Sequence, residues 1–364
     1  MEDPSSTEET MTRKEFLRLM ATGVVAMAIG CRTGSERMKT WIWMGVPDGS
    51  KEALRTRFRQ MRDFGIDAVL LHENKEEGPA FYERMLPLAH DAGVELHAWI
   101  PTMMRSELVA SHPEWYAVNR KGESAADKPA YVDYYHFLSP CVPEVRAYLA
   151  DYIDRIARIK GLDGVHLDYI RFPDVILPIT LQPKYGLVQD REYPAFDYGY
   201  HPTCIARFKA QTSIDPRTLE DPSAHEAWRQ FRYDQITEVV QQLAEVVHRH
   251  GKPLTAAVFP TPRIARTLVR QDWVRWPLDA VMPMIYHNFY DKPVSWIEEA
   301  TREGVEALQG RIPLYSGLFI PALTPRELVE AVAHARAGGA AGVSLFNVRS
   351  MTPEHWEALL DTLR

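Results

Sequence analysis

The sequence lacks the features that mark several large classes of protein. It has no basic block, and its 49 acidic residues against 42 basic ones give a formal net charge of -7. Nucleic acid is therefore not expected as a partner, because its binding requires a basic surface. No glycine-rich phosphate loop follows the first predicted strand, and no Gly-x-Ser-x-Gly motif occurs. These absences disfavour a nucleotide-binding fold and a hydrolase with a nucleophile elbow.

Long hydrophobic runs are also missing. The first hydrophobic run in the chain is a short one near its N-terminus. An uncharged stretch over residues 19–30 follows Arg13 and Lys14 and ends at Cys31. It is too short to span a bilayer and is typical of an export signal. Its "RKEFL" resembles a twin-arginine signal with one arginine replaced by lysine, and its "AIGC" resembles the lipobox of bacterial lipoproteins. We therefore predict that residues 1–39 are an export signal and short tether, with Cys31 lipidated and the protein anchored facing the periplasm or the cell exterior.

Cysteine is scarce, and only Cys141 and Cys204 remain beyond the signal. An exported protein can pair two such residues. Both lie near predicted helix starts, however, and the sequence gives no geometry for a bridge. We therefore favour two unpaired thiols over a disulfide.

Apolar runs alternate with amphipathic helical patterns over residues 40–364. Most runs are continuous rather than alternating, which is typical of parallel strands covered on both faces. They lie at residues 40–46, 66–73, 94–100, 163–168, 254–259, 279–286, 313–319 and 341–347. Eight strand–helix units over about 320 residues predict a single (β/α)8 barrel over residues 40–364, with a doubly wound open sheet as the alternative.

Two insertions account for the extra length of the predicted barrel. They follow the third and fourth strands, at residues 101–141 and 171–223. Both would lie at the C-terminal ends of the strands, where barrel enzymes keep their sites. The second insertion carries five aromatic residues, which would form a sugar platform or pack on one another: Tyr185, Tyr193, Phe196, Tyr198 and Tyr200.

Polar and aromatic residues gather at the predicted strand ends. A polar side chain at the end of an apolar run is costly unless it is paired or faces a cleft. We therefore predict a substrate-binding rim that consists of His72, His97, Trp99, His166, Tyr169, Arg171, Tyr286, His287, Asn288 and Asn347.

Asp168, the last residue of the fourth predicted strand, is the strongest catalytic candidate. A pair with Arg171 would keep it charged, and a charged Asp168 can act as a nucleophile or stabilise an oxocarbenium-like transition state. His166, two residues earlier, would lie beneath Asp168 and orient it. Glycoside hydrolysis also needs a proton donor, and Glu73 is the best rim candidate. The alternative for Glu73 is a solvated loop position, and its rivals as the acid are Asp133, Asp174, Asp190 and Asp197.

The stretch "LDGVHLDYIRFP" at 162–173 resembles the fourth-strand signature of the glycosyl-hydrolase-like 10 family, bacterial (β/α)8 proteins of cell-envelope polysaccharide metabolism. Four other segments agree in order: "GVELHAWI" at 93–100, "PCVPEVRAYLADYI" at 140–153, "RQDWVRWPLDAVMPMIY" at 270–286 and "GAAGVSLFNVRSM" at 339–351. The resemblance implies a glycoside hydrolase without a cofactor, acting on peptidoglycan glycan strands or another envelope polysaccharide. Asp168 would be its catalytic residue, and Tyr169 stands where family members often carry a second acid.

Two other functions stay open. A non-catalytic glycan-binding barrel would keep the aromatic rim but lack a paired carboxyl group. A metal-dependent amidohydrolase or deacetylase would gather His72, His97, His166 and Asp168 around a metal ion. The first predicted strand has no His-x-His pair for such a site, and we expect no bound metal.

Overall fold

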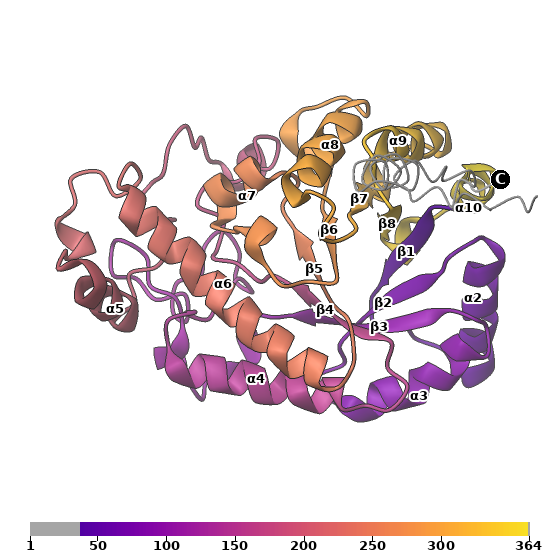
Figure 1. The fold of residues 1–364 in the computed structure, drawn as a ribbon, viewed down its shortest axis with the longest axis horizontal. Coiled ribbons are helices and arrows are strands. Elements are labelled where there is room, and N and C mark those ends of the chain that lie inside the picture. Colours follow the sequence, from indigo (N-terminus) through magenta and orange to yellow (C-terminus); the bar gives the residue numbers. More distant parts are fainter. Residues whose placement is uncertain (1–36, 363–364) are drawn as a thin grey trace, which may run out of the picture. The chain divides into compact units, whose positions relative to one another are not determined.

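A computed structural model describes residues 37–362, in which parallel strands and the helices that connect them form a (β/α)8 barrel (Figure 1). The predicted lipidation site, Cys31, lies outside the described residues. All eight predicted strands are present, and all pair in parallel. They are β1 (Lys39–Met44), β2 (Ala68–His72), β3 (Glu95–Pro101), β4 (Gly164–Asp168), β5 (Leu254–Val258), β6 (Ala280–Pro283), β7 (Tyr315–Phe319) and β8 (Gly342–Phe346). The doubly wound alternative is wrong.

The barrel closes between β6 and β7. The hydrogen-bonded order runs β6-β5-β4-β3-β2-β1-β8-β7, and two parallel bridges, Val281–Leu314 and Met284–Gly317, join its ends. A Cβ atom at Gly317 would lie 2.6 Å from the carbonyl oxygen of Pro283. Glycine at this position therefore allows the two strands to approach and complete the barrel.

Helices cover the outside of the barrel, and α4 and α6 lie side by side there (Figure 1). The helices are α2 (Lys51–Asp63), α3 (Pro79–His90), α4 (Pro143–Ala157), α5 (Pro202–Thr212), α6 (Glu226–Arg249), α7 (Pro262–Val269), α8 (Trp296–Leu308), α9 (Pro325–Ala337) and α10 (Pro353–Thr362). Among residues 37–362, no helix has the length and apolar character needed to cross a membrane.

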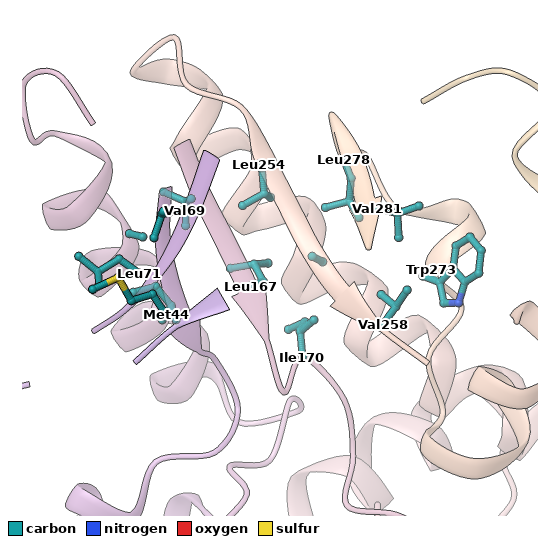
Figure 2. Close-up of a cluster of buried hydrophobic side chains, with 14 of the residues drawn as sticks. Met44, Val69, Leu71, Leu167, Ile170, Leu254, Val258, Trp273, Leu278 and Val281 are labelled. Atoms are coloured by element: carbon teal, nitrogen blue, oxygen red, sulfur yellow. The ribbon is translucent and has the colours of Figure 1, made fainter. Parts of the chain in front are cut away.

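The strands bury side chains on both faces, as the continuous apolar runs predicted. The outer faces pack against the helices, and Leu71, Leu167 and Val281 belong to this layer (Figure 2). The inner faces fill the barrel with a separate cluster that includes Trp43 and Trp99. Because successive strand residues point to opposite faces, each strand delivers every second residue to the barrel interior.

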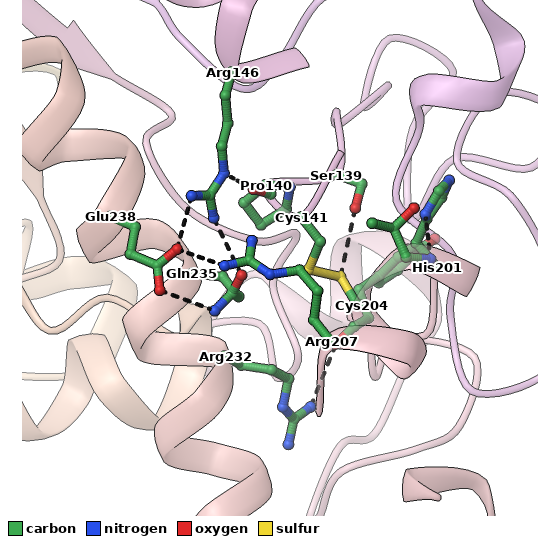
Figure 3. Close-up of a disulfide and its surroundings, with 12 residues drawn as sticks. Ser139, Pro140, Cys141, Arg146, His201, Cys204, Arg207, Arg232, Gln235 and Glu238 are labelled. Atoms are coloured by element: carbon green, nitrogen blue, oxygen red, sulfur yellow. Dashed lines mark hydrogen bonds and ion pairs between the residues drawn. A yellow bond between two sulfur atoms is a disulfide. The ribbon is translucent and has the colours of Figure 1, made fainter. Parts of the chain in front are cut away.

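A disulfide joins Cys141 to Cys204, so the prediction of unpaired thiols is wrong (Figure 3). Cys141 precedes α4, and Cys204 lies in α5 at the end of the second insertion. No local pattern in the sequence indicates that the second insertion returns to the start of α4. Arg146 of α4 and Arg207 of α5 both pair with Glu238 of α6, at 2.7 and 2.8 Å, which ties these two helices to α6 as well.

Buried ion pairs anchor the second insertion from its other side. Arg232 of α6 pairs with Asp197, and Arg270, which follows α7, pairs with Glu192. Both guanidinium groups are almost fully buried. Arg270 also lies 3.6 Å from Asp197, so the two pairs form one network. The insertion is therefore a fixed part of the barrel's C-terminal end.

Replacing both disulfide cysteines by serine will lower the free energy of unfolding by about 2–5 kcal/mol, since the bridge closes a long loop in the unfolded chain. The loop spans 63 residues. Urea unfolding of the wild type and the double variant measures the difference, and wild type in reductant serves as the control. Equal unfolding midpoints in all three samples would contradict a stabilising bridge.

Candidate active site

A cavity of about 470 Å³ opens at the C-terminal end of the barrel. Its floor consists of residues at or just after strand ends, and its walls come mainly from the two insertions and the loop after β6. The floor includes His72, Trp99, Asp168, Phe259, Met284, Phe319 and Phe346, and the walls include Tyr131, Tyr134, Tyr135, Asp174, Leu177, Leu181, Tyr185, Tyr286, Phe289 and Tyr290. Aromatic rings dominate this lining, and such rings present flat apolar faces to a ligand.

Asp168 lies at the floor of the cavity with both carboxyl oxygens engaged. The indole Nε1 of Trp99 donates to Oδ2 at 2.8 Å, and the backbone N–H of Tyr169 donates to Oδ1 at 2.6 Å. Tyr169 has a φ of 47°, a left-handed conformation that turns the chain directly after β4. The Trp99 indole and the Tyr169 amide therefore fix the orientation of the Asp168 carboxyl group.

Burial raises the pKa of Asp168 above its ordinary value. The group is 9% exposed and surrounded by aromatic side chains, so its charged form loses hydration. The hydrogen bonds from Trp99 and from the Tyr169 amide act in the opposite direction, as do the more distant charges of Arg171 and His72. Desolvation is the largest of these effects, and the site therefore favours the protonated acid more than water does.

His72 and Trp99 support Asp168 from β2 and β3. Their rings meet edge to face with centroids 4.7 Å apart. The Nδ1 atom of His72 lies 2.9 Å from the backbone oxygen of Glu73. The predicted rim residues His72, Trp99 and Tyr169 are thus brought together around Asp168, and all three line the cavity.

Glu73 is not part of the cavity, and this corrects its prediction as the proton donor. Its Oε1 accepts a hydrogen bond from Arg105 at 2.7 Å, and its Oε2 accepts one from the hydroxyl of Tyr152 on α4. Strand alternation explains the placement, because His72 points inward and the next residue points to the helix layer. Glu73 is 3% exposed, so the solvated alternative is also wrong.

His97 and His166 point into the barrel but lie below the cavity. His97 lies near the start of β3, and its ring centroid is 4.5 Å from that of Trp41. His166 accepts a hydrogen bond from Trp43 Nε1 at 3.3 Å and lies 2.8 Å from Thr255 Oγ1. Burial lowers the pKa of His166 well below its ordinary value. His166 has no hydrogen bond to Asp168, so the predicted orienting contact is not formed.

Arg171 lines the cavity but pairs with Asp174 rather than with Asp168. Its Nη1 lies 2.9 Å from Asp174 Oδ2, and its Nη2 donates to the hydroxyl of Tyr135 at 2.9 Å. Four aromatic rings lie around the guanidinium, among them Phe137 and Phe259, each at 5.2 Å. The predicted pair between Arg171 and Asp168 is therefore replaced by a buried pair within the β4–α5 loop.

Of the four remaining predicted rim residues, one lines the cavity and three do not. Tyr286 lines the cavity. His287 is buried beside it, and burial lowers its pKa. The backbone oxygen of Asn288 accepts from Thr180, and the side chain of Asn347 accepts from the backbone of Arg349. None of these three is among the residues that form the cavity wall.

The aromatic residues of the second insertion were predicted either to form a sugar platform or to pack on one another, and each alternative holds for some of them. Tyr185 lines the cavity, whereas Tyr198 and Tyr200 are buried within the protein. Phe196 stacks on Tyr131 of the first insertion, with ring centroids 4.5 Å apart. Several cavity residues that were not predicted come from the first insertion, including Tyr131 and Tyr135. The aromatic run "YVDYYHF" at 131–137 was the available signal.

The ligand set of the metal-dependent alternative is not assembled. His72 and Asp168 lie at the cavity, while His97 and His166 occupy the lower interior of the barrel. Within residues 37–362, no three His, Cys, Asp or Glu side chains are grouped as metal ligands would be.

Changing Trp99 to phenylalanine will raise the pKa of Asp168 further, because the variant keeps an aromatic ring but removes the donor that stabilises the carboxylate. A carboxyl-carbon NMR titration of the labelled protein measures this shift. The matched control is W41F, which changes a tryptophan in the same barrel interior, away from Asp168. An unchanged or lower pKa in W99F would refute the assigned hydrogen bond.

Comparisons with solved structures agree on the barrel. The glycoside hydrolase domain of PgaB (BpsB) from Bordetella bronchiseptica superimposes with a TM-score of 0.66 and 15% identity, covering 90% of this chain and 99% of that one. The catalytic domain of a β-amylase from Paenibacillus polymyxa gives 0.60 and 10%, covering 89% and 97%. A β-galactosidase from Marinomonas ef1 gives 0.61 and 13%, covering 90% of this chain and 59% of its own. At these identities the similarity shows a shared fold.

The search of curated proteins gave no significant match. The sequence profile described as glycosyl hydrolase-like 10 matches residues 67–176. This segment runs from the start of β2 to the loop after β4, and it contains His72, Trp99, Asp168 and Asp174. This matched segment includes the motif at residues 162–173, on which the predicted resemblance to the glycosyl hydrolase-like 10 family rests.

Proposed function

We propose that this protein is a glycoside hydrolase that cleaves a polysaccharide, with Asp168 as a catalytic carboxyl group. The observation that carries the proposal is the setting of Asp168. It is a buried carboxyl group, held by two hydrogen bonds, at the floor of an aromatic cavity on the C-terminal end of a barrel. The family match over residues 67–176 supports the same activity.

The environment of Asp168 suits a general acid. A glycosidase must protonate the oxygen of the leaving sugar, and a raised pKa favours the form of the carboxyl group that carries this proton. When the proton leaves, the hydrogen bonds from Trp99 and the Tyr169 amide stabilise the carboxylate that forms. This role replaces the nucleophile or base expected from the sequence, because Asp168 is desolvated rather than paired with Arg171.

The aromatic lining suits a sugar ligand. Tyr131, Tyr185, Tyr286 and Phe346 offer ring faces to the apolar faces of pyranose units, while their neighbours exclude water from the reacting bond. We propose an envelope polysaccharide as the substrate, with peptidoglycan glycan strands as one candidate. This choice rests on the predicted export signal and on the family resemblance.

We also propose that the protein is exported and anchored through a lipid at Cys31. The disulfide between Cys141 and Cys204 supports this location, because such bonds persist mainly in oxidising compartments. Mass spectrometry of the membrane fraction tests the modification directly. An unmodified Cys31 in the mature protein would contradict the anchor.

Changing Asp168 to asparagine will lower kcat about 10²–10⁴-fold, the usual contribution of a positioned general acid. The assay incubates the mature protein with a panel of bacterial envelope and plant polysaccharides and measures the release of reducing ends. The matched control is E73Q, which changes a buried carboxylate outside the cavity. This control will keep near wild-type turnover per folded molecule, although loss of the Arg105 partner lowers its stability by about 3–5 kcal/mol.

The same assay separates hydrolysis from simple glycan binding. If wild type binds a polysaccharide of the panel without releasing reducing ends, the non-catalytic alternative is favoured. If D168N turns over as fast as wild type, Asp168 has no catalytic role.

A further inference from the structure

Hydrolysis with Asp168 as the acid leaves one chemical requirement unmet. Water must be activated for attack at the anomeric carbon, and most glycosidases use a second carboxylate for this or for direct attack. Glu73 lies outside the cavity, with both of its oxygens engaged by Arg105 and Tyr152. Among the described residues, Asp174 is the other carboxylate that lines the cavity.

Asp174 is held as an ion-paired carboxylate with one oxygen left over. Its Oδ2 accepts from Arg171 Nη1 at 2.9 Å and from the hydroxyl of Tyr135 at 3.1 Å. Tyr131 holds the backbone at the same point, because its hydroxyl donates to the carbonyl oxygen of Asp174 at 2.7 Å. Within residues 37–362, no hydrogen bond reaches Oδ1. The side chain is 3% exposed, so a ligand or water in the cavity is the partner that Oδ1 can still take.

Asp168 and Asp174 thus occupy opposite environments in one cavity. Asp168 is desolvated among aromatic rings, away from any cation in direct contact. Asp174 is paired with Arg171, whose own charge is retained by this carboxylate and by the rings around it. Two carboxyl groups in such different surroundings, one desolvated and one ion-paired, are the usual arrangement for an acid and a base in one site.

The two carboxyl groups are held by different parts of the site. Asp168 ends β4 on the cavity floor, whereas Asp174 lies on the wall formed by the loop that follows. The Tyr169 ring and the Arg171 side chain lie between these two carboxyl groups. The Arg171 guanidinium is 5.4 Å from the centroid of the Tyr169 ring. Arg171 bonds to Asp174 but forms no ion pair with Asp168. No hydrogen bond or ion pair links the two carboxyl groups directly, and a water molecule bound at Asp174 Oδ1 would be the nucleophile that inverting glycosidases use.

We propose that Asp174 is the general base of an inverting hydrolysis and that it is the second catalytic carboxylate of the site. Asp174 Oδ1 takes a proton from water, and the water oxygen bonds to the anomeric carbon. The bond from that carbon to the glycosidic oxygen breaks, and this oxygen takes the proton of Asp168. The product sugar carries the new hydroxyl on the opposite face. Return of the proton from Asp174 to Asp168 through solvent restores the enzyme.

This inference rests on the proposed glycoside hydrolase activity, and its test uses the polysaccharide that wild type cleaves in the panel. Proton NMR of the wild-type reaction follows the anomer released first. Inversion is expected, and retention would overturn the role of Asp174 as a base for water. This measurement needs no variant, so it stands even if a substitution at Asp174 prevents folding.

Variants then separate the two carboxyl groups. D174N will lower kcat at least 100-fold on the polysaccharide and on an activated dinitrophenyl glycoside of the same sugar. D168N will lose activity on the polysaccharide but keep most of it on the activated glycoside, whose leaving group needs no proton. The matched control, D190N, changes an exposed acid in the same insertion and will act as wild type does.

The kinetics of these variants distinguish a failure of the role inferred for Asp174 from a failure of the proposed function. If D174N keeps kcat and raises only KM, Asp174 binds the sugar and is not catalytic, and the inference fails while the proposed function stands. Wild-type kinetics in a folded D174N also overturn it. If wild type cleaves nothing in the panel and binds no activated glycoside, the proposed function itself fails.

Discussion

The alternation of side chains along eight closed parallel strands decides which residues can reach the site. Each strand sends every second residue into the barrel, and the inward residues near its C-terminal end reach the cavity. On β4 this rule places His166 in the lower interior and Asp168 at the floor of the cavity. On β2 it sends His72 inward and the following Glu73 toward α4. The catalytic assignment depends on these one-residue differences.

The aromatic lining has two consequences for the chemistry. It offers ring faces to a sugar, and it removes water from Asp168, which raises the pKa of that carboxyl group. The hydrogen bond from Trp99 opposes this rise in pKa, and it stabilises the carboxylate that Asp168 becomes after it has given up its proton. Asp174 lies in a different setting, because Arg171 and Tyr135 both donate hydrogen bonds to its Oδ2 atom. One cavity therefore provides different environments for two carboxyl groups only six positions apart in the chain.

Much of this arrangement could be predicted from local patterns in the sequence. The eight apolar runs gave the strands, and the position of Asp168 at a strand end placed it in the site. Contacts that depend on the insertions could not be predicted. The Cys141–Cys204 disulfide and the Arg171–Asp174 pair form only once the loops after β3 and β4 fold over the barrel. Glu73 was misplaced because a continuous apolar run marks the end of a strand but does not show which of two adjacent residues, His72 or Glu73, faces the barrel interior.

A crystal structure of the D168N variant with a bound oligosaccharide of the cleaved polysaccharide tests the central claim most directly. The account predicts that the scissile glycosidic oxygen lies within about 2.6–3.2 Å of the side chain at position 168, with the sugar in contact with the aromatic walls. A glycan bound outside this cavity, or with its scissile bond beyond the reach of position 168, would contradict the account.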